Sequence, residues 1–125
     1  MMDNIIISPN KSTFGIHFNF EKGLLEFSGT SYPDNAADFF EPLCDWVKKL
    51  IVNSKKGITV NFKINYFNTS SSKYIFLILE LLSTYYKTNS NLVINWYFFD
   101  GEEDMLEAWK EIVDELSLPY NIILQ

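Results

Sequence analysis

The sequence predicts an α/β fold: a mixed, mostly parallel sheet that carries three main helices largely on one of its faces. After an opening hairpin, segments with the two-residue alternation of strands follow segments with helical spacing. Strand–helix–strand units of this length join parallel strands through right-handed crossovers. Because the strands alternate instead of reading as continuous apolar runs, we expect helices on one face only. The polar residues expected on the open face are His17, Asn19, Glu26, Asn61, Lys63, Asn65 and Asn95.

The chain begins with a predicted hairpin. Residues 14–20 read FGIHFNF, and this alternation is typical of a half-buried strand. A turn containing Gly23 follows, and residues 24–29 (LLEFSG) continue as the antiparallel return strand. The NIII run at residues 4–7 is expected to add a short edge strand. The side chains of the first long strand that should face the core are Phe14, Ile16, Phe18 and Phe20.

The first helix is expected to follow the SYPDNAA segment. This segment supplies turn residues, with Asp34 or Asn35 as the candidate N-cap. Helical spacing of apolar residues then continues to about Asn53. Pro42 interrupts the pattern, because proline lacks an N–H group and crowds the preceding turn. The helix should therefore either kink at Pro42 or become regular only near Glu41. Its apolar stripe contains Phe39, Phe40, Leu43, Trp46, Val47, Leu50 and Ile51.

The rest of the chain alternates strands with helices. Residues 57–67 (GITVNFKINYF) are predicted as a strand, and a second helix is expected from about Ser70 to Lys87. A strand at 92–99 precedes a third helix within residues 100–117, and YNIILQ is expected to close the chain as a strand. In the strand at 57–67, the residues expected to face the core are Ile58, Val60, Phe62, Ile64 and Tyr66. The second helix should bury Ile75, Ile78, Leu79, Leu82, Tyr85 and Tyr86, and the third Met105, Leu106, Trp109, Ile112, Val113 and Leu116.

Composition and charge favour one compact domain over residues 1–125. The length is close to the commonest domain size, and 47% hydrophobic with 21% charged residues is ordinary globular composition. The net charge of −6 and the scattered lysines argue against nucleic acid and anionic membrane as partners. The apolar runs are too short for a signal-peptide core or a membrane span. The single Cys44 rules out an internal disulfide and fits a soluble protein of the reducing cytoplasm.

The sequence offers little for catalysis. His17 is the sole histidine and should lie on the outward face of its strand, while Cys44 has no identifiable activating partner. Neither a phosphate-binding glycine loop nor a spaced Cys/His set occurs. The acidic run EEDMLEAWKEIVDE follows the exposed face of an amphipathic helix, and its first acids suit the helix dipole. We therefore expect no catalytic residue, no metal and no cofactor.

Residues 66–74 read YFNTSSSKY and place four successive hydroxyl side chains between a strand and an apolar helix. One hydroxyl is explained if it caps the amides of the first helical turn. A regulatory role is the alternative, since a phosphoryl group there would meet free N–H groups and the positive end of the helix dipole. Lys73 in the first turn could approach such a group. Phe76 is expected to point outward with Leu77 beside it, which makes both candidates for contact with a partner.

Three stretches of the sequence resemble one known family. They are FEKGLLEFSGTSYPDNAADFFEPLCDW, then FKINYFNTSSSKY, then NWYF with GEEDMLEA after it. The order of elements and the strand–NTSS–helix junction are similar to STAS domains, the anti-anti-sigma fold. The similarity is closer to SiaC-type regulatory phosphoproteins and spans nearly the whole chain. It implies a STAS-like single domain that acts in bacterial signal transduction, including c-di-GMP signalling.

This resemblance implies that Thr69 is reversibly phosphorylated, with Ser70 and Ser71 as alternates. A cognate histidine-kinase-like Ser/Thr kinase would add the phosphate, and a metal-dependent Ser/Thr phosphatase would remove it. The unmodified form is implied to bind and regulate an effector such as a diguanylate cyclase. The chain departs from the family pattern by an extra serine at position 72. The expected partner-binding residues are Asn68, Ser70, Ser71, Ser72, Lys73, Phe76, Leu77, Tyr32 and Asp34.

A different class of function is a small-ligand module that works without phosphorylation. Such a module would use the open, polar face of the sheet. Asn61, Lys63, Asn65 and Asn95 are the residues expected to bind something flat and polar there, or simply to face water.

Overall fold

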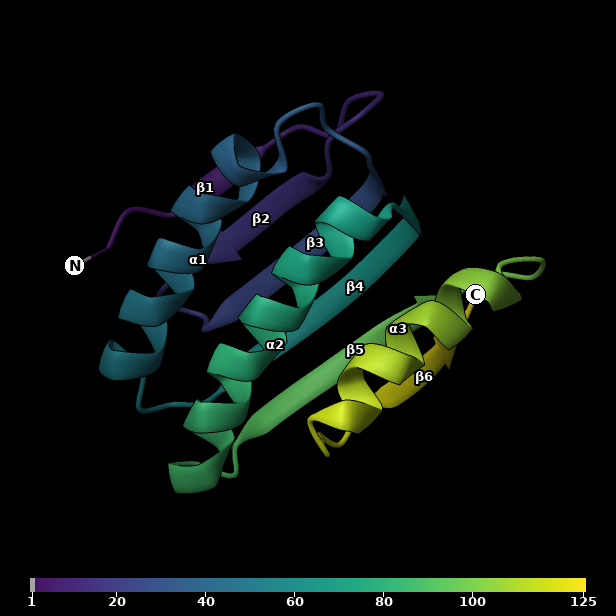
Figure 1. The fold of residues 1–125 in the computed structure, drawn as a ribbon. Coiled ribbons are helices and arrows are strands. Elements are labelled where there is room, and N and C mark those ends of the chain that lie inside the picture. The colour runs from purple at the N-terminus through teal and green to yellow at the C-terminus, as the bar shows by residue number, and fades with distance from the viewer. Residues whose placement is uncertain (1) are drawn as a thin grey trace.

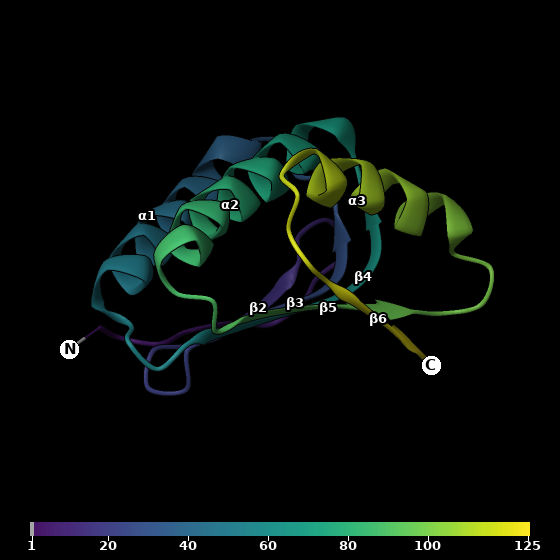
Figure 2. The same cartoon turned by 90° about the horizontal axis from the view of Figure 1, so that it is seen from below.

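The computed structural model describes residues 2–125, and within them one six-stranded sheet carries three helices on a single face. Figure 1 shows the helices lying across the sheet, and Figure 2 shows the two layers from the edge. The predicted fold class and the one-sided cover by helices are confirmed. One face of the sheet is therefore available to solvent or to a partner.

The strands run in sequence order across the sheet, β1-β2-β3-β4-β5-β6. The β1–β2 and β2–β3 pairs are antiparallel, and β3 to β6 are parallel. The elements are β1 (Ile5–Ile7), β2 (Gly15–Asn19), β3 (Leu24–Ser31), α1 (Ala36–Asn53), β4 (Ile58–Phe67), α2 (Thr69–Thr88), β5 (Leu92–Phe98), α3 (Glu103–Glu115) and β6 (Asn121–Leu124). The predicted order is confirmed. Several boundaries differ by one residue, among them α2, which begins at Thr69, and β3 continues two residues further than predicted, to Ser31.

Helix α1 is continuous through Pro42. Asn35 is its N-cap, and the Asn35 side chain accepts a hydrogen bond of 3.2 Å from the backbone N–H of Asp38. The expectation of a regular helix that begins only near Glu41 is therefore wrong. Pro42 is exposed, so the carbonyl that loses its N–H partner lies on the side of the helix that water reaches. Within residues 2–125, no helix combines the length and the apolar character needed to cross a membrane.

The core lies between the sheet and the helices, and aromatic rings form a row through it. Phe18 contacts Phe27 at 5.3 Å between ring centroids, and Phe27 stacks on Phe62 at 5.1 Å. Phe62 contacts Trp109 of α3 at 5.5 Å, and Trp109 stacks on Trp96 at 5.0 Å. All five side chains are almost fully buried. Trp109 is fully buried and packs α3 against side chains of β4 and β5.

The regular alternation of β4 stops at a bulge near its end. Ile64 pairs with Gly29 of β3, but the next pair is Tyr66 with Thr30, so Asn65 is an extra residue. Asn65 and Tyr66 are both exposed, and Phe67 is buried. The prediction that Tyr66 faces the core is therefore wrong, because a bulge shifts the alternation by one residue. It places Phe67 in the core directly before α2.

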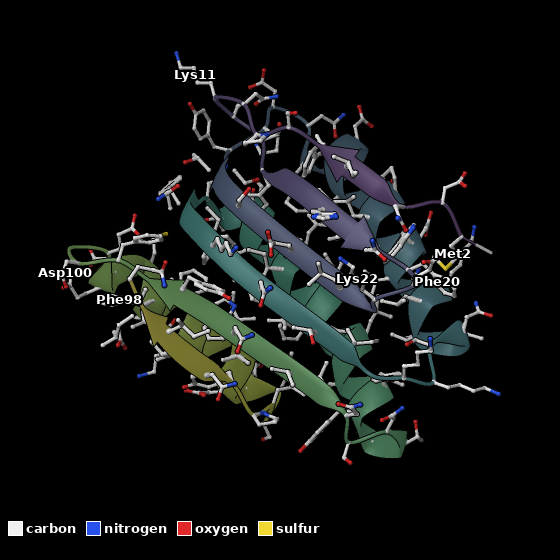
Figure 3. The ribbon with its side chains drawn as sticks, turned by 180° about the vertical axis from the view of Figure 1, so that it is seen from behind. Met2, Lys11, Phe20, Lys22, Phe98 and Asp100 are labelled. Carbon is white, nitrogen blue, oxygen red and sulfur yellow. The ribbon has the colours of Figure 1, made fainter. Side chains whose placement is uncertain are left out.

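Figure 3 shows the sheet from the side without helices. This open face carries a row of mutually bonded polar side chains. Asn121 donates to Asn95 at 3.1 Å, Asn95 donates to Asn61 at 2.9 Å, and Asn61 donates to Glu26 at 3.1 Å. The ammonium of Lys63 lies 3.5 Å from the second oxygen of Glu26. The polar groups of this row satisfy one another and need no ligand to do so.

Candidate functional site

The candidate site lies where β3 and β4 end and α2 begins. The backbone N–H of Asn68 donates to the carbonyl of Ser31 at 3.0 Å, which joins the two segments. The N–H of Tyr32 donates in turn to the carbonyl of Ser12 at 2.8 Å. The loop that holds Tyr32 and Asp34 therefore borders the hydroxyl run, as the sequence predicts. In Figure 1 the ends of β3 and β4 lie beside the start of α2.

Asn68, and none of the hydroxyl residues, is the N-cap of α2. Its side-chain oxygen accepts a hydrogen bond of 2.9 Å from the N–H of Ser71. Its carbonyl accepts from the N–H of Ser72 at 2.9 Å. The expectation that a hydroxyl caps this helix is wrong, because the helix begins one residue earlier and Asn is an equally good cap. The hydroxyl of Thr69, the first helical residue, is left free for another use.

Replacing Asn68 with alanine should lower the free energy of unfolding by about 1 kcal/mol, because the N–H of Ser71 then loses its acceptor. Urea unfolding followed by circular dichroism measures this change. Ser70→Ala is the matched control, since Ser70 is exposed and its loss should change stability by less than about 0.5 kcal/mol. Equal effects of the two substitutions would contradict the assignment of the cap.

The four hydroxyl groups differ in what they contact. Ser71 is fully buried, lies 2.8 Å from the hydroxyl of Ser31, and donates to the Ser31 carbonyl at 3.2 Å. The Ser72 hydroxyl donates to the carbonyl of Thr69 at 2.7 Å. Thr69 and Ser70 are exposed, and within residues 2–125 their hydroxyls form no hydrogen bond. Only these two hydroxyls are open to another protein and not engaged elsewhere.

Thr69 also lines a surface depression of about 250 Å³ between the start of α2 and α3. Thr69 and Ser72 contribute from α2, and the residues of α3 along it are Ala108, Glu111 and Ile112. Phe67 and Asn68 complete the lining. Ser70 does not line it. The two exposed hydroxyls therefore differ in surroundings, and Thr69 is the one beside a concave surface.

The start of α2 is electrostatically suited to an anion. Within residues 2–125, the N–H groups of Thr69 and Ser70 have no hydrogen-bond acceptor, as expected for the first turn of a helix. The first turn holds no acidic residue, and Lys73 is exposed close by. Free amides and the positive end of the helix dipole favour a negative group here by about 0.3 to 1 kcal/mol at an exposed position. A phosphoryl group on Thr69 is thus compatible with the local structure.

The other predicted contact residues differ in exposure and surroundings. Phe76 lies two helical turns from Thr69 on the same side of α2, but it is half-buried and does not point fully outward as predicted. Leu77 is 43% exposed and lines a different depression, of about 400 Å³, between α1 and α2. Tyr32 is 39% exposed, and Asp34 is also exposed. Of the two apolar candidates, Leu77 is the more accessible.

Two residues near the site are absent from the predicted partner-binding residues. Tyr66 is 44% exposed at the edge where β4 ends, and Glu111 lies across the depression from Thr69. The signal for Tyr66 was the adjacent pair Tyr66–Phe67, because consecutive strand residues cannot both face the core. Nothing in the sequence places Glu111 beside Thr69.

The groups with catalytic potential lie apart. His17 is exposed on the open face of β2. Cys44 lies in α1 on the covered face, and burial raises the pKa of its thiol, which keeps it protonated. A nucleophile and a base must lie within hydrogen-bond reach to act together. These two residues are separated by the sheet.

Comparisons with known proteins identify the family and the shared fold. The family model described as "SiaC family regulatory phosphoprotein" matches residues 7–125. An uncharacterized protein of Pseudomonas aeruginosa is 27% identical over 121 residues, which is 97% of this chain and 96% of that protein. The structure of apo-SiaC from Pseudomonas aeruginosa has a TM-score of 0.88 at 26% identity and covers 98% of this chain and 99% of that one. A chain in the structure of the diguanylate cyclase SiaD with its activator SiaC, from the same organism, has a TM-score of 0.90 at 26% identity, with 97% and 99% covered.

Proposed function

This chain belongs to the SiaC family of regulatory phosphoproteins, and we propose that it is a partner switch controlled by reversible phosphorylation of Thr69. In this proposal the protein is not an enzyme. Its unmodified form binds and regulates an effector, and its phosphorylated form releases that effector.

The exposed hydroxyl of Thr69 at the first position of α2 is the observation that carries the proposal. A kinase must reach the acceptor oxygen, and this oxygen is not engaged within the described residues. Ser71 is buried and bonded to Ser31, so modifying it would require the start of α2 to open. Ser70 is exposed but stands outside the depression that Thr69 lines. Thr69 is therefore the preferred acceptor.

The proposed partners follow from the family. They are a cognate histidine-kinase-like Ser/Thr kinase, a metal-dependent Ser/Thr phosphatase and an effector, with a diguanylate cyclase as the candidate. The relative from Pseudomonas aeruginosa is described as the activator of the diguanylate cyclase SiaD. The match covers nearly the whole of both chains, which supports an effector of the same class here.

The switch itself would be electrostatic. A phosphoryl group adds about −1.5 to −2 charges at neutral pH and needs to be solvated or paired. On a chain whose net charge is already −6, it turns the surface beside α2 into one that an apolar or acidic partner cannot cover without a desolvation cost. The start of α2 can carry the group without unfolding, so the modified protein stays folded while its affinity changes.

Purification from the host organism tests the proposal directly. Intact mass and peptide mapping should show a fraction with one phosphoryl group, and the modified residue should be Thr69. The effector should co-purify with the unmodified fraction and be depleted from the modified one. Modification only at another residue, or equal recovery of the effector with both fractions, would overturn the proposal.

A further inference from the structure

The depression beside Thr69 has an acidic wall. Glu111 of α3 lines it opposite Thr69 and Ser72. The lysine of α3, Lys110, lies 3.8 Å from the carboxylate of Glu107 instead. Within residues 2–125, Glu111 takes part in no salt bridge. A phosphoryl group on Thr69 would therefore share this depression with an uncompensated negative charge.

Helix α3 cannot easily rotate about its axis to move Glu111 away from the depression. Trp109 and Val113, on either side of Glu111 in sequence, are fully buried in the core. Rotating α3 to remove Glu111 from the depression would expose both side chains, each of which contributes roughly 1.5 to 3 kcal/mol by being buried. The neighbouring walls of the depression, Ala108 and Ile112, carry no polar side-chain groups. The backbone of Glu111 is therefore held beside the depression, and its exposed carboxylate acts on the rest of the lining through solvent.

We infer that Glu111 keeps the phosphoryl group of Thr69 out of the depression between α2 and α3. This inference rests on the proposed function, because it concerns the state in which Thr69 is phosphorylated. The free N–H groups of Thr69 and Ser70 attract the group towards the helix end, and Glu111 repels it. The phosphate is therefore directed towards solvent, where a docking partner would contact it. It does not bind in the depression on the protein's own surface.

The repulsion has a measurable consequence for phosphothreonine itself. A nearby like charge disfavours the doubly charged form, so Glu111 should raise the second pKa of the phosphoryl group. Two exposed charges on the walls of one depression should shift this pKa by about 0.3 units, because solvent screens them only in part. Glu111 is the charged residue among those that line the depression, and Lys73, four residues after Thr69 in α2, acts in the opposite direction and stays unchanged in the comparison.

Phosphothreonine incorporated at position 69 during translation allows a direct test by ³¹P NMR titration between about pH 5 and pH 8. Glu111→Gln should lower the second pKa relative to the otherwise unchanged protein, and the amide proton of Ser70 should shift as the phosphate approaches it. Glu103→Gln is the matched control. It removes the same charge from an exposed position that lies about 12 Å from Glu111 along α3 and outside the depression, so it should change the pKa much less than Glu111→Gln does.

Equal pKa values in the parent protein and Glu111→Gln, or equal shifts from Glu111→Gln and Glu103→Gln, would overturn this inference. Because the phosphate is installed during translation, the titration does not depend on any kinase. If the host kinase modifies another residue, the proposed function fails while the pKa comparison still decides the role of Glu111.

Discussion

Replacing Thr69 with alanine is expected to abolish phosphoryl transfer from the cognate kinase while the fold stays intact. The substitution removes the acceptor oxygen and nothing else that the protein uses, since the Thr69 hydroxyl is exposed and forms no hydrogen bond within residues 2–125. Alanine is also a better helix former than threonine, so stability should change by less than about 0.5 kcal/mol. Kinase assays with labelled ATP, followed by peptide mapping, measure the loss.

Two variants make the assay specific. Ser70→Ala removes the other exposed hydroxyl of the junction and should be labelled like the unaltered protein. Thr69→Ser keeps a hydroxyl at the same position and should still be labelled. Labelling of Thr69→Ala at the level of the unaltered protein would show that a different hydroxyl is the acceptor.

The Thr69→Ala variant should bind the effector whether or not the kinase is active. Because it cannot be phosphorylated, its affinity for the effector should not fall when the kinase and ATP are present. Thr69→Glu should weaken binding, although less than phosphate does, since glutamate carries one charge where a phosphoryl group carries about two. An effector dissociation constant that is the same for Thr69→Glu and the unaltered protein would count against an electrostatic switch.

The fold could be predicted because each element repeats its own pattern. The alternation in FGIHFNF and GITVNFKINYF marks strands with one covered face, and the helical spacing from Phe39 to Ile51 marks a helix on that face. Polar residues in the strands at positions such as Asn61 and Asn95 showed that the second face is open. These patterns are local, so they can be recognised in the sequence without knowledge of tertiary contacts.

The site was only partly predictable, because its details depend on contacts between distant segments. The sequence indicates that the NTSS run starts a helix, but it does not say which of several capping residues is used. The helix begins at Thr69, so Asn68 becomes the cap. Ser71 is committed by its bond to Ser31, a residue 40 positions away. Glu111 lies at the site because α3, which connects β5 to β6, packs beside α2. The hydrophobic periodicity of α3 does not indicate that α2 is its neighbour.

The bulge in β4 is the clearest case, and it yields a prediction with a large effect on stability. Simple alternation through Phe62 and Ile64 buries Tyr66 and exposes Phe67, whereas the structure leaves Tyr66 44% exposed and Phe67 only 5% exposed. Phe67→Ala should therefore lower the free energy of unfolding by about 3 to 5 kcal/mol, the usual cost of emptying a buried phenylalanine site.

Tyr66→Ala is the matched control for Phe67→Ala, since it truncates an aromatic side chain one residue away in the same strand. It should cost about 1 kcal/mol, well below the cost of Phe67→Ala, because Tyr66 is 44% exposed and loses less buried area than Phe67 does. Guanidinium unfolding of both variants, with similar m-values, measures the difference. A larger loss of stability for Tyr66→Ala than for Phe67→Ala would mean that Tyr66 is the buried residue, and would contradict the bulge. Because Phe67 stands directly before the cap Asn68, its burial also fixes where α2 begins, and hence places Thr69 at the first, accessible position of that helix.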